Sequence, residues 1–467
     1  MKRIAIIITF IISVSSSIQA QYSFSGIRTS KRAGILGATI NPAEIASMPQ
    51  KIDVHLFGAD FNLVNNVVNL SSSEIGKLDS FKERFFNNIT PDGLTVRLNF
   101  DIVGPSAAVA INKKMTVGLM TRGRILLSMN NIDIATGRAL ASSETIDNAT
   151  LPYTTPRINN MSMNLIGWGE IGGLFAINLY DSKQHSLSGG ACLKGIFPGG
   201  YANTYLTNFK ATIDTTAGGN VRMSNSSGSI GLEYSGSNDP LNSLFSNFIG
   251  GPKGVGFDLG GSYQYKDKKT GEYILKLGAS IVDIGSINFN LNSQNSRKFE
   301  LNSSAIIDPN TLQGDDMDQI INNIKTSGIA TEIANDSQVS IGLPTAFNLT
   351  ADWNIWKSIY LTLHMQRSLN DLNNPRSLQA ANFLNFTPRV SFKLFEAYLP
   401  VSFSDIQGTT VGIGLKLGPM YIGTNSLLSA VLSETNKAID MHMGFRFALG
   451  KRNKEEKPEE KKADRKS

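Results

Sequence analysis

Cysteine is nearly absent from the sequence. Cys192 is the only one among 467 residues, which excludes an intramolecular disulfide framework and a cysteine-based metal site. The four histidines are scattered without the regular spacing of metal ligands, at His55, His185, His364 and His442. We therefore expect neither a metal ion nor a cofactor.

Motifs of catalysis are also missing. The sequence has no Gly-x-Ser-x-Gly elbow, no phosphate-binding loop and no His-Glu-x-x-His pair, and its 43 glycines are scattered. The formal net charge of +6 is small for this length and lies partly at the two ends, so it does not indicate nucleic-acid binding. The sequence predicts a protein that is not an enzyme.

Long apolar runs are limited to the start of the chain. Met1-Lys2-Arg3 is positively charged, residues 4–14 are largely apolar, and small and polar residues follow up to Ala20. This order is typical of a secretory signal peptide over residues 1–20, with Gln21 as the mature N-terminus. No later stretch approaches the roughly 18 apolar residues that a membrane-spanning helix needs. An exported chain of this kind is either released or embedded in a membrane as a closed barrel.

The connections between predicted strands alternate in length. We expect strands near residues 52–68, 93–111, 115–131, 161–180, 185–204, 254–266, 272–290, 338–353, 357–368, 384–394, 396–404, 409–417, 419–430 and 438–449. Connections 69–92, 133–160, 206–253 and 291–337 are long, whereas 112–114, 181–184, 267–271 and 354–356 are short. This alternation predicts an all-β fold: a closed antiparallel transmembrane β-barrel of about 14 strands over residues 51–450, with long extracellular loops and short periplasmic turns.

Within the strands, apolar and polar residues alternate. Leu94, Val96 and Leu98 share one face, and Thr95 and Arg97 share the other. In lipid the apolar face points outward, so the charged face must line the lumen. The charged residues expected in the lumen are Arg97, Asp101, Arg122, Arg124, Glu170, Lys194, Asp258, Lys276, Arg389, Lys393 and Arg446, with Asp352, Lys416 and Asp440 beside them. These charges make a mildly cationic lumen, in which they either pair with one another as polar filling or select an anionic or amphipathic solute.

Two long connections have helical spacing, at residues 74–86 and 315–324. After Gly450 the chain is almost entirely charged, which predicts a disordered periplasmic tail over residues 451–467. A protein partner of this tail is an alternative to plain disorder.

A series of short motifs carries a family resemblance. In order they are Gly104-Pro105-Ser106, Thr121-Arg122-Gly123-Arg124, Trp168-Gly169-Glu170 with Lys194-Gly195, Gly256-Phe257-Asp258-Leu259-Gly260, Ser280-Ile281-Val282-Asp283-Ile284-Gly285, Leu343-Pro344-Thr345, Thr387-Pro388-Arg389 and Leu417-Gly418-Pro419. Together they resemble a Bacteroidetes-type family of outer-membrane β-barrels classed as a domain of unknown function. The resemblance covers about residues 30–449. It implies insertion in the outer membrane, in contact with its lipid.

Asn41-Pro42-Ala43, after the glycine-containing stretch 34–38, is similar to the long-chain fatty-acid transporter (FadL-like) superfamily. In those transporters the N-terminal segment folds into the lumen, which by analogy implies that residues 21–50 plug this barrel. The charged tail departs from that family, and no lipid-binding motif is evident, so a hydrophobic substrate does not follow.

Three functional hypotheses remain open. The first is a barrel that binds or passes a small amphipathic or anionic solute. The second is a structural or accessory barrel whose loops or tail engage a surface or secretion complex. The third is a secreted all-β binding protein, which differs from both in needing no detergent for solubility.

Overall fold

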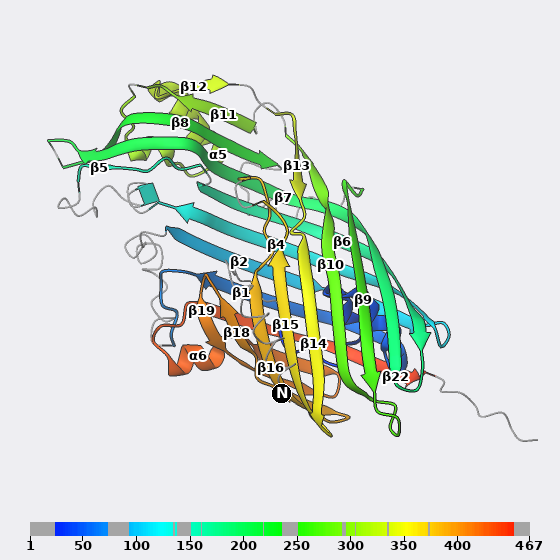
Figure 1. Ribbon diagram of the computed structural model, residues 1–467. Helices are drawn as coiled ribbons and strands as arrows, with labels where there is room; N and C mark the ends of the chain where they lie inside the picture. Colours follow the sequence, from blue (N-terminus) through cyan, green and yellow to red (C-terminus); the bar gives the residue numbers. More distant parts are fainter. Residues whose placement is uncertain are drawn as a thin grey trace, which may run out of the picture.

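The protein forms one closed antiparallel barrel with a sheet projecting from one rim (Figure 1). The computed structural model describes residues 24–72, 93–133, 136–137, 151–159, 161–217, 219–235, 251–291, 296–303, 305–333, 336–371 and 374–452. The signal peptide, the helix expected at 74–86 and most of the charged tail lie outside the described residues.

The wall has 14 strands, several of them broken in two. In order around the wall they are β1 (Gln50–Asn65), β2 (Leu94–Val103) with β3 (Ser106–Ala110), β4 (Met115–Ile132), β6 (Met161–Asp181), β7 (His185–Thr215), β9 (Gly254–Lys266), β10 (Tyr273–Asn290), β13 (Gln338–Gly342) with β14 (Ala346–Trp356), β15 (Ile359–Ser368), β16 (Phe383–Ser391), β17 (Phe395–Tyr398) with β18 (Val401–Ser404), β19 (Gly408–Val411) with β20 (Ile413–Leu417), β21 (Met420–Thr424) and β22 (Ala438–Lys451). Antiparallel pairing of β1 with β22 closes the cylinder. The predicted fold class is confirmed.

The outer surface of the wall is apolar. Leu193 and Val255 are each 62% exposed, while their neighbour Lys194 is 2% exposed and points inward. A closed cylinder leaves no unpaired strand edge, and its apolar exterior suits hydrocarbon. Among the described residues, no helix has the length and apolar character to cross a membrane.

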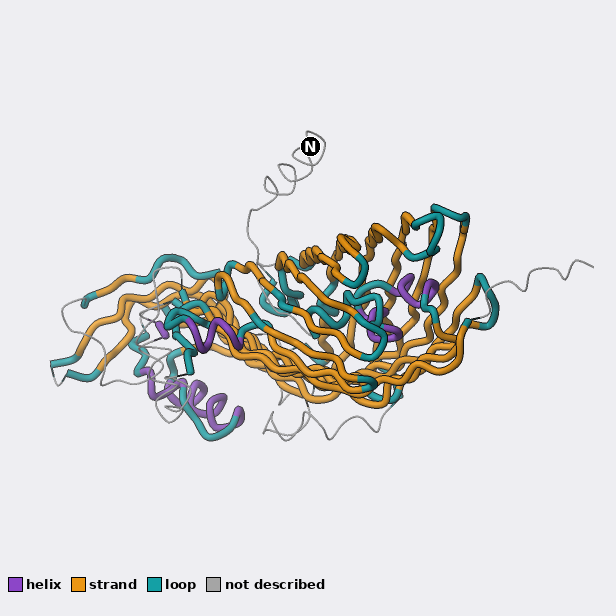
Figure 2. Tube along the Cα trace, turned by 90° about the horizontal axis from the view of Figure 1, so that it is seen from below, coloured by secondary structure: helices purple, strands orange, loops and turns teal. Residues whose placement is uncertain are grey.

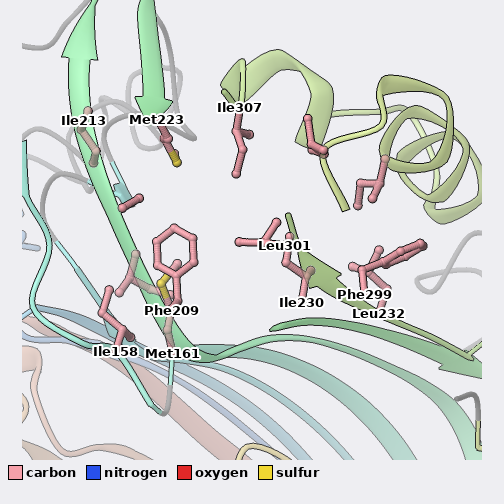
Figure 3. Packing of buried hydrophobic residues seen from close by; sticks show 14 of the residues in the cluster. Ile158, Met161, Phe209, Ile213, Met223, Ile230, Leu232, Phe299, Leu301 and Ile307 are labelled. Carbon is pink, nitrogen blue, oxygen red and sulfur yellow. The ribbon is translucent and has the colours of Figure 1, made fainter. Parts of the chain in front are cut away.

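A second sheet extends beyond one rim, where β7 continues past the wall. The C-terminal half of β7 pairs with β8 (Val221–Ser235), β8 with β11 (Ser296–Leu301), and β11 with β12 (Ala330–Ile333), and β5 (Tyr153–Thr154) pairs with β7. Buried apolar residues hold this sheet together with η5 (Pro309–Leu312) and α5 (Met317–Ser327), among them Phe209, Met223, Phe299 and Ile307 (Figure 3). We call this unit the rim sheet.

The rim sheet departs from the sequence prediction in part. Helix α5 confirms the helix expected at 315–324, with the Asp316 side chain capping its first turn and Gly328 ending it at φ 67°. Strand β8 was wrongly assigned to a loop, because its many serines and glycines give little apolar alternation. The end of the strand expected at 419–430 is wrong, since residues 427–430 belong to the short helix α6 (Leu427–Leu432).

The lumen as the candidate functional site

The segment before β1 lies inside the barrel. Its helical turns η1 (Gly34–Thr39) and η2 (Pro42–Ser47) are enclosed by the wall (Figure 2). Inward carboxylates of β1 fix it, because Asp60 accepts the Phe24 N–H at 2.8 Å and Asp53 accepts the Ile35 N–H at 3.0 Å. We call residues 24–49 the inner segment.

Asn41-Pro42-Ala43 rests on glycines of the wall. The Asn41 side chain donates to the Gly261 carbonyl at 2.9 Å, and a Cβ at Gly260 would lie 2.1 Å from Asn41 Oδ1. A Cβ at Gly190 would lie 2.5 Å from the backbone nitrogen of Ala43. Glycine is therefore needed here so that two backbones can approach closely. We call Gly190 and Gly260 the glycine seat.

Ion pairs across five wall strands fill the middle of the lumen. Arg122 makes a bidentate pair with Asp101, at 2.7 and 2.5 Å. Lys194 lies 2.8 Å from Asp258 and 3.7 Å from Glu170. Each of these five side chains was expected in the lumen, and each is buried. Buried charges are tolerated only when paired in this way.

Arg124 joins the same network through a residue that the alternation missed. Its guanidinium lies 2.7 Å from Asp283 and 3.4 Å from Glu170. Counting alternate positions from Lys276 places Asp283 on the lipid side. A bulge between Ile281 and Ile284 turns it inward, with φ 58°. An acidic residue on an otherwise apolar face was the sequence signal for that bulge.

The remaining expected residues lie apart from this network. Lys276 pairs with Glu44 of the inner segment at 2.5 Å, and Arg389 pairs with Asp352 at 2.7 Å. Arg446 pairs with Asp53 through its Nε at 3.0 Å. Arg97 donates to Gln379 at 2.7 Å. Each of these cations therefore has a polar partner within the barrel.

One expected lumen residue is placed wrongly by the alternation. Lys393 follows the end of β16, in the turn before β17, and is exposed. The expected cationic excess is also wrong, because the structure adds the inward carboxylates of Glu44, Asp53, Asp60 and Asp283. Cationic and anionic side chains in the lumen are nearly balanced.

A polar chamber remains between the inner segment and the loop after β15, which lies at the same end of the barrel as the rim sheet. It measures about 50 Å³ and is lined by Arg28 and Thr39 of the inner segment, by Arg122, Arg124 and Trp168 of the wall, and by Gln379, Ala380 and Ala381 of the loop after β15, among others. This volume is the space open to the centres of water-sized groups, so the chamber has room for water or a small polar group. Among the described residues, no group of His, Cys, Asp and Glu side chains is arranged to hold a metal ion.

The loop over the chamber is tied to the rim sheet. Arg376 donates through Nε to both carboxylate oxygens of Glu233, at 2.9 and 3.1 Å. The hydroxyls of Tyr201 and Tyr205 also donate to Glu233, each at 2.9 Å. This cluster connects the rim sheet with the cover of the chamber. Sequence reasoning missed it, since Glu233 and Arg376 both lie in segments read as polar loops.

The closed wall, the apolar exterior and the charged lumen define an outer-membrane type of transmembrane β-barrel. A family model described as "Family of unknown function (DUF5723)" matches residues 42–425. The chain therefore belongs to that family, in agreement with the resemblance drawn from its motifs.

Solved structures give distant matches. A FadL homologue from Pseudomonas aeruginosa is 10% identical, with 92% of this chain and 98% of that chain covered and a TM-score of 0.40. A mutant of the monoaromatic hydrocarbon channel TodX is 9% identical over 88% and 92%, with a TM-score of 0.42. The toluene transporter TodX from Pseudomonas putida is 10% identical over 92% and 93%, with a TM-score of 0.34. At these scores the likeness carries no functional information. No curated protein matches this chain.

Proposed function

We propose that this barrel binds and passes a small amphipathic or anionic solute, and that the inner segment acts as its removable plug. One observation carries the proposal: the inner segment fills the lumen as a separate piece that non-covalent contacts and the glycine seat hold in place, and it continues covalently into the wall at the start of β1. If the polar residues of the lumen only filled the barrel, side chains of the wall could do so without a separate inner segment. Displacing it would leave a polar channel through the membrane.

The glycine seat provides the test. Gly260→Val puts a side chain where Asn41 lies, whereas Gly261→Val meets nothing closer than the Ser188 carbonyl at 3.8 Å. In planar bilayers we expect stable single-channel conductance from Gly260→Val, and rare openings from Gly261→Val and the native chain. If both Gly260→Val and a variant lacking residues 24–49 stay silent while inserted, the proposed passage is wrong.

The rim sheet favours a second function, attachment to a surface or secretion complex. It projects beyond the wall, and most of the apolar cluster that holds it together lies outside the wall strands, which a simple channel does not require (Figure 1). Crosslinking on intact cells tests this function. A specific partner that is lost on shortening the rim sheet, with conductance unchanged, would support it.

A further inference from the structure

Arg28 lines the chamber without an ion-pair partner, whereas the other charged side chains there, Arg122, Arg124 and Asp283, are paired. It belongs to the inner segment, is 7% exposed and lines the chamber. Its guanidinium makes one long contact, from Nη1 to the Thr39 hydroxyl at 3.5 Å. Among the described residues no carboxylate lies in ion-pair contact with it. Asp60 and Asp101 act on it at longer range, and each already accepts a shorter bond, from Phe24 and Arg122 respectively.

The like charges around Arg28 make this lack of a partner costly. Arg122 and Arg124 line the same chamber, and both repel Arg28. Their own carboxylate partners lie at 2.5–2.7 Å and are already engaged. A buried guanidinium needs a counter-charge and hydrogen-bond acceptors to offset its loss of hydration. A single anion bound in the chamber would provide both the counter-charge and the hydrogen-bond acceptors.

We infer that the chamber binds one small monoanion, of the size of chloride or a single carboxylate group, with Arg28 as its principal contact. The inference rests on the proposed function, whose solute it defines more closely. The space open to the centres of water-sized groups is about 50 Å³. One unpaired guanidinium matches a single negative charge, so an amphipathic solute would place its anionic group against Arg28. Amide groups of Asn99, Gln366 and Gln379 line the same space and offer neutral donors.

Trp168 provides a reporter within the chamber wall. It is 1% exposed, and the guanidinium of Arg124 lies 4.7 Å from its ring centroid. The sequence has three tryptophans, and the other two, Trp353 and Trp356, are 48% and 63% exposed. In the full-length protein carrying Trp353→Phe and Trp356→Phe, Trp168 is the only indole. Its fluorescence then reports on the chamber.

Iodide serves as the probe, because it is a small monoanion that quenches indole fluorescence. We expect saturable quenching of Trp168 by iodide after equilibration, reversed by chloride or formate, and little quenching by neutral acrylamide. Arg28→Gln should weaken the apparent affinity at least tenfold, and Arg28→Lys by less. Arg32→Gln is the matched control, since Arg32 is also in the inner segment but donates to Ser391 at 3.2 Å, outside the chamber. It should leave the quenching unchanged.

The result separates this inference from the proposed passage. Non-saturable iodide quenching, or saturable quenching that Arg28→Gln leaves intact, overturns the anion site even if Gly260→Val conducts. Saturable, Arg28-dependent quenching in a barrel that never conducts keeps the anion site and overturns the passage.

Discussion

Lys194 on β7 and Asp283 on β10 are joined across the strand that lies between them, with Nζ and Oδ1 2.6 Å apart. Asp258 on the intervening β9 lies 2.8 Å from the same ammonium group and also accepts the N–H of Asp283 at 2.7 Å. One cation thus holds three neighbouring strands together below the chamber.

Lys194→Met should destabilise the barrel strongly. It leaves the carboxylates of Glu170, Asp258 and Asp283 buried with less counter-charge, and breaking a buried pair costs about 3–5 kcal/mol. Lys393→Met is the control, because that side chain is exposed in a turn. It should change stability by less than about 0.5 kcal/mol. Urea unfolding followed by heat-modifiable gel migration measures both; equal midpoints would contradict the assigned network.

The same residues show how far the sequence could predict the site. Strict alternation placed Lys194, Asp258 and Glu170 correctly, because period-two patterning and a buried polar face are coupled in any barrel wall. It failed at Asp283, where a bulge changes the parity, and at Lys393, where the strand had already ended. Strict alternation assumes a regular strand, so it misplaces residues beyond a bulge unless an acidic residue on the apolar face, such as Asp283, is taken as its sign.

The fold was predicted more completely than the chamber. The order of long and short connections depends only on the strands, and their apolar faces are readable in the sequence. Long-range packing of loops and of the inner segment determines the contacts of Arg28, Glu233 and Arg376. Such contacts produce no periodic pattern in the local sequence. Gly260 itself was a sequence signal for the glycine seat. Glycine is unfavourable within strands, so its presence there indicates that another backbone approaches closely.

Glu233→Gln should loosen the loop that covers the chamber. It removes the charge that Arg376, Tyr201 and Tyr205 share, and a charged hydrogen bond of this kind contributes about 1.5–3 kcal/mol. Trypsin cleavage after Arg376 in proteoliposomes should therefore be accelerated at least tenfold, since about 1.4 kcal/mol corresponds to a factor of ten. Glu300→Gln is the control, because Glu300 is exposed on β11. Equal cleavage rates would show that the Glu233 cluster does not restrain the loop.

Phe299→Ala should open the rim sheet while the barrel stays folded. Phe299 is fully buried in its core, and such truncations cost about 3–5 kcal/mol. Because most of the apolar cluster around Phe299 lies in the rim sheet and not in the wall strands, the loss should remain local. Limited proteolysis should cut within residues 201–235 or 296–333, which form the rim sheet, while the barrel keeps its heat-modifiable migration. Ile306→Ala, at a side chain 58% exposed, should behave like the native chain, and global unfolding of Phe299→Ala would show that the two parts are one cooperative unit.

Leu193 and Ile306 test which surface of the molecule faces hydrocarbon and which faces water. Both are exposed, at 62% and 58%, but Leu193 is on the barrel wall and Ile306 is in the rim sheet. An arginine facing hydrocarbon near the bilayer midplane costs about 2–4 kcal/mol, whereas one facing water costs little. In liposomes, Leu193→Arg should therefore reduce the free energy of unfolding by about 2–4 kcal/mol. Ile306→Arg should reduce it by less than about 0.5 kcal/mol. Folding titrations in urea measure the difference. If Leu193→Arg is tolerated as well as Ile306→Arg, then water surrounds the wall and the barrel does not span a membrane.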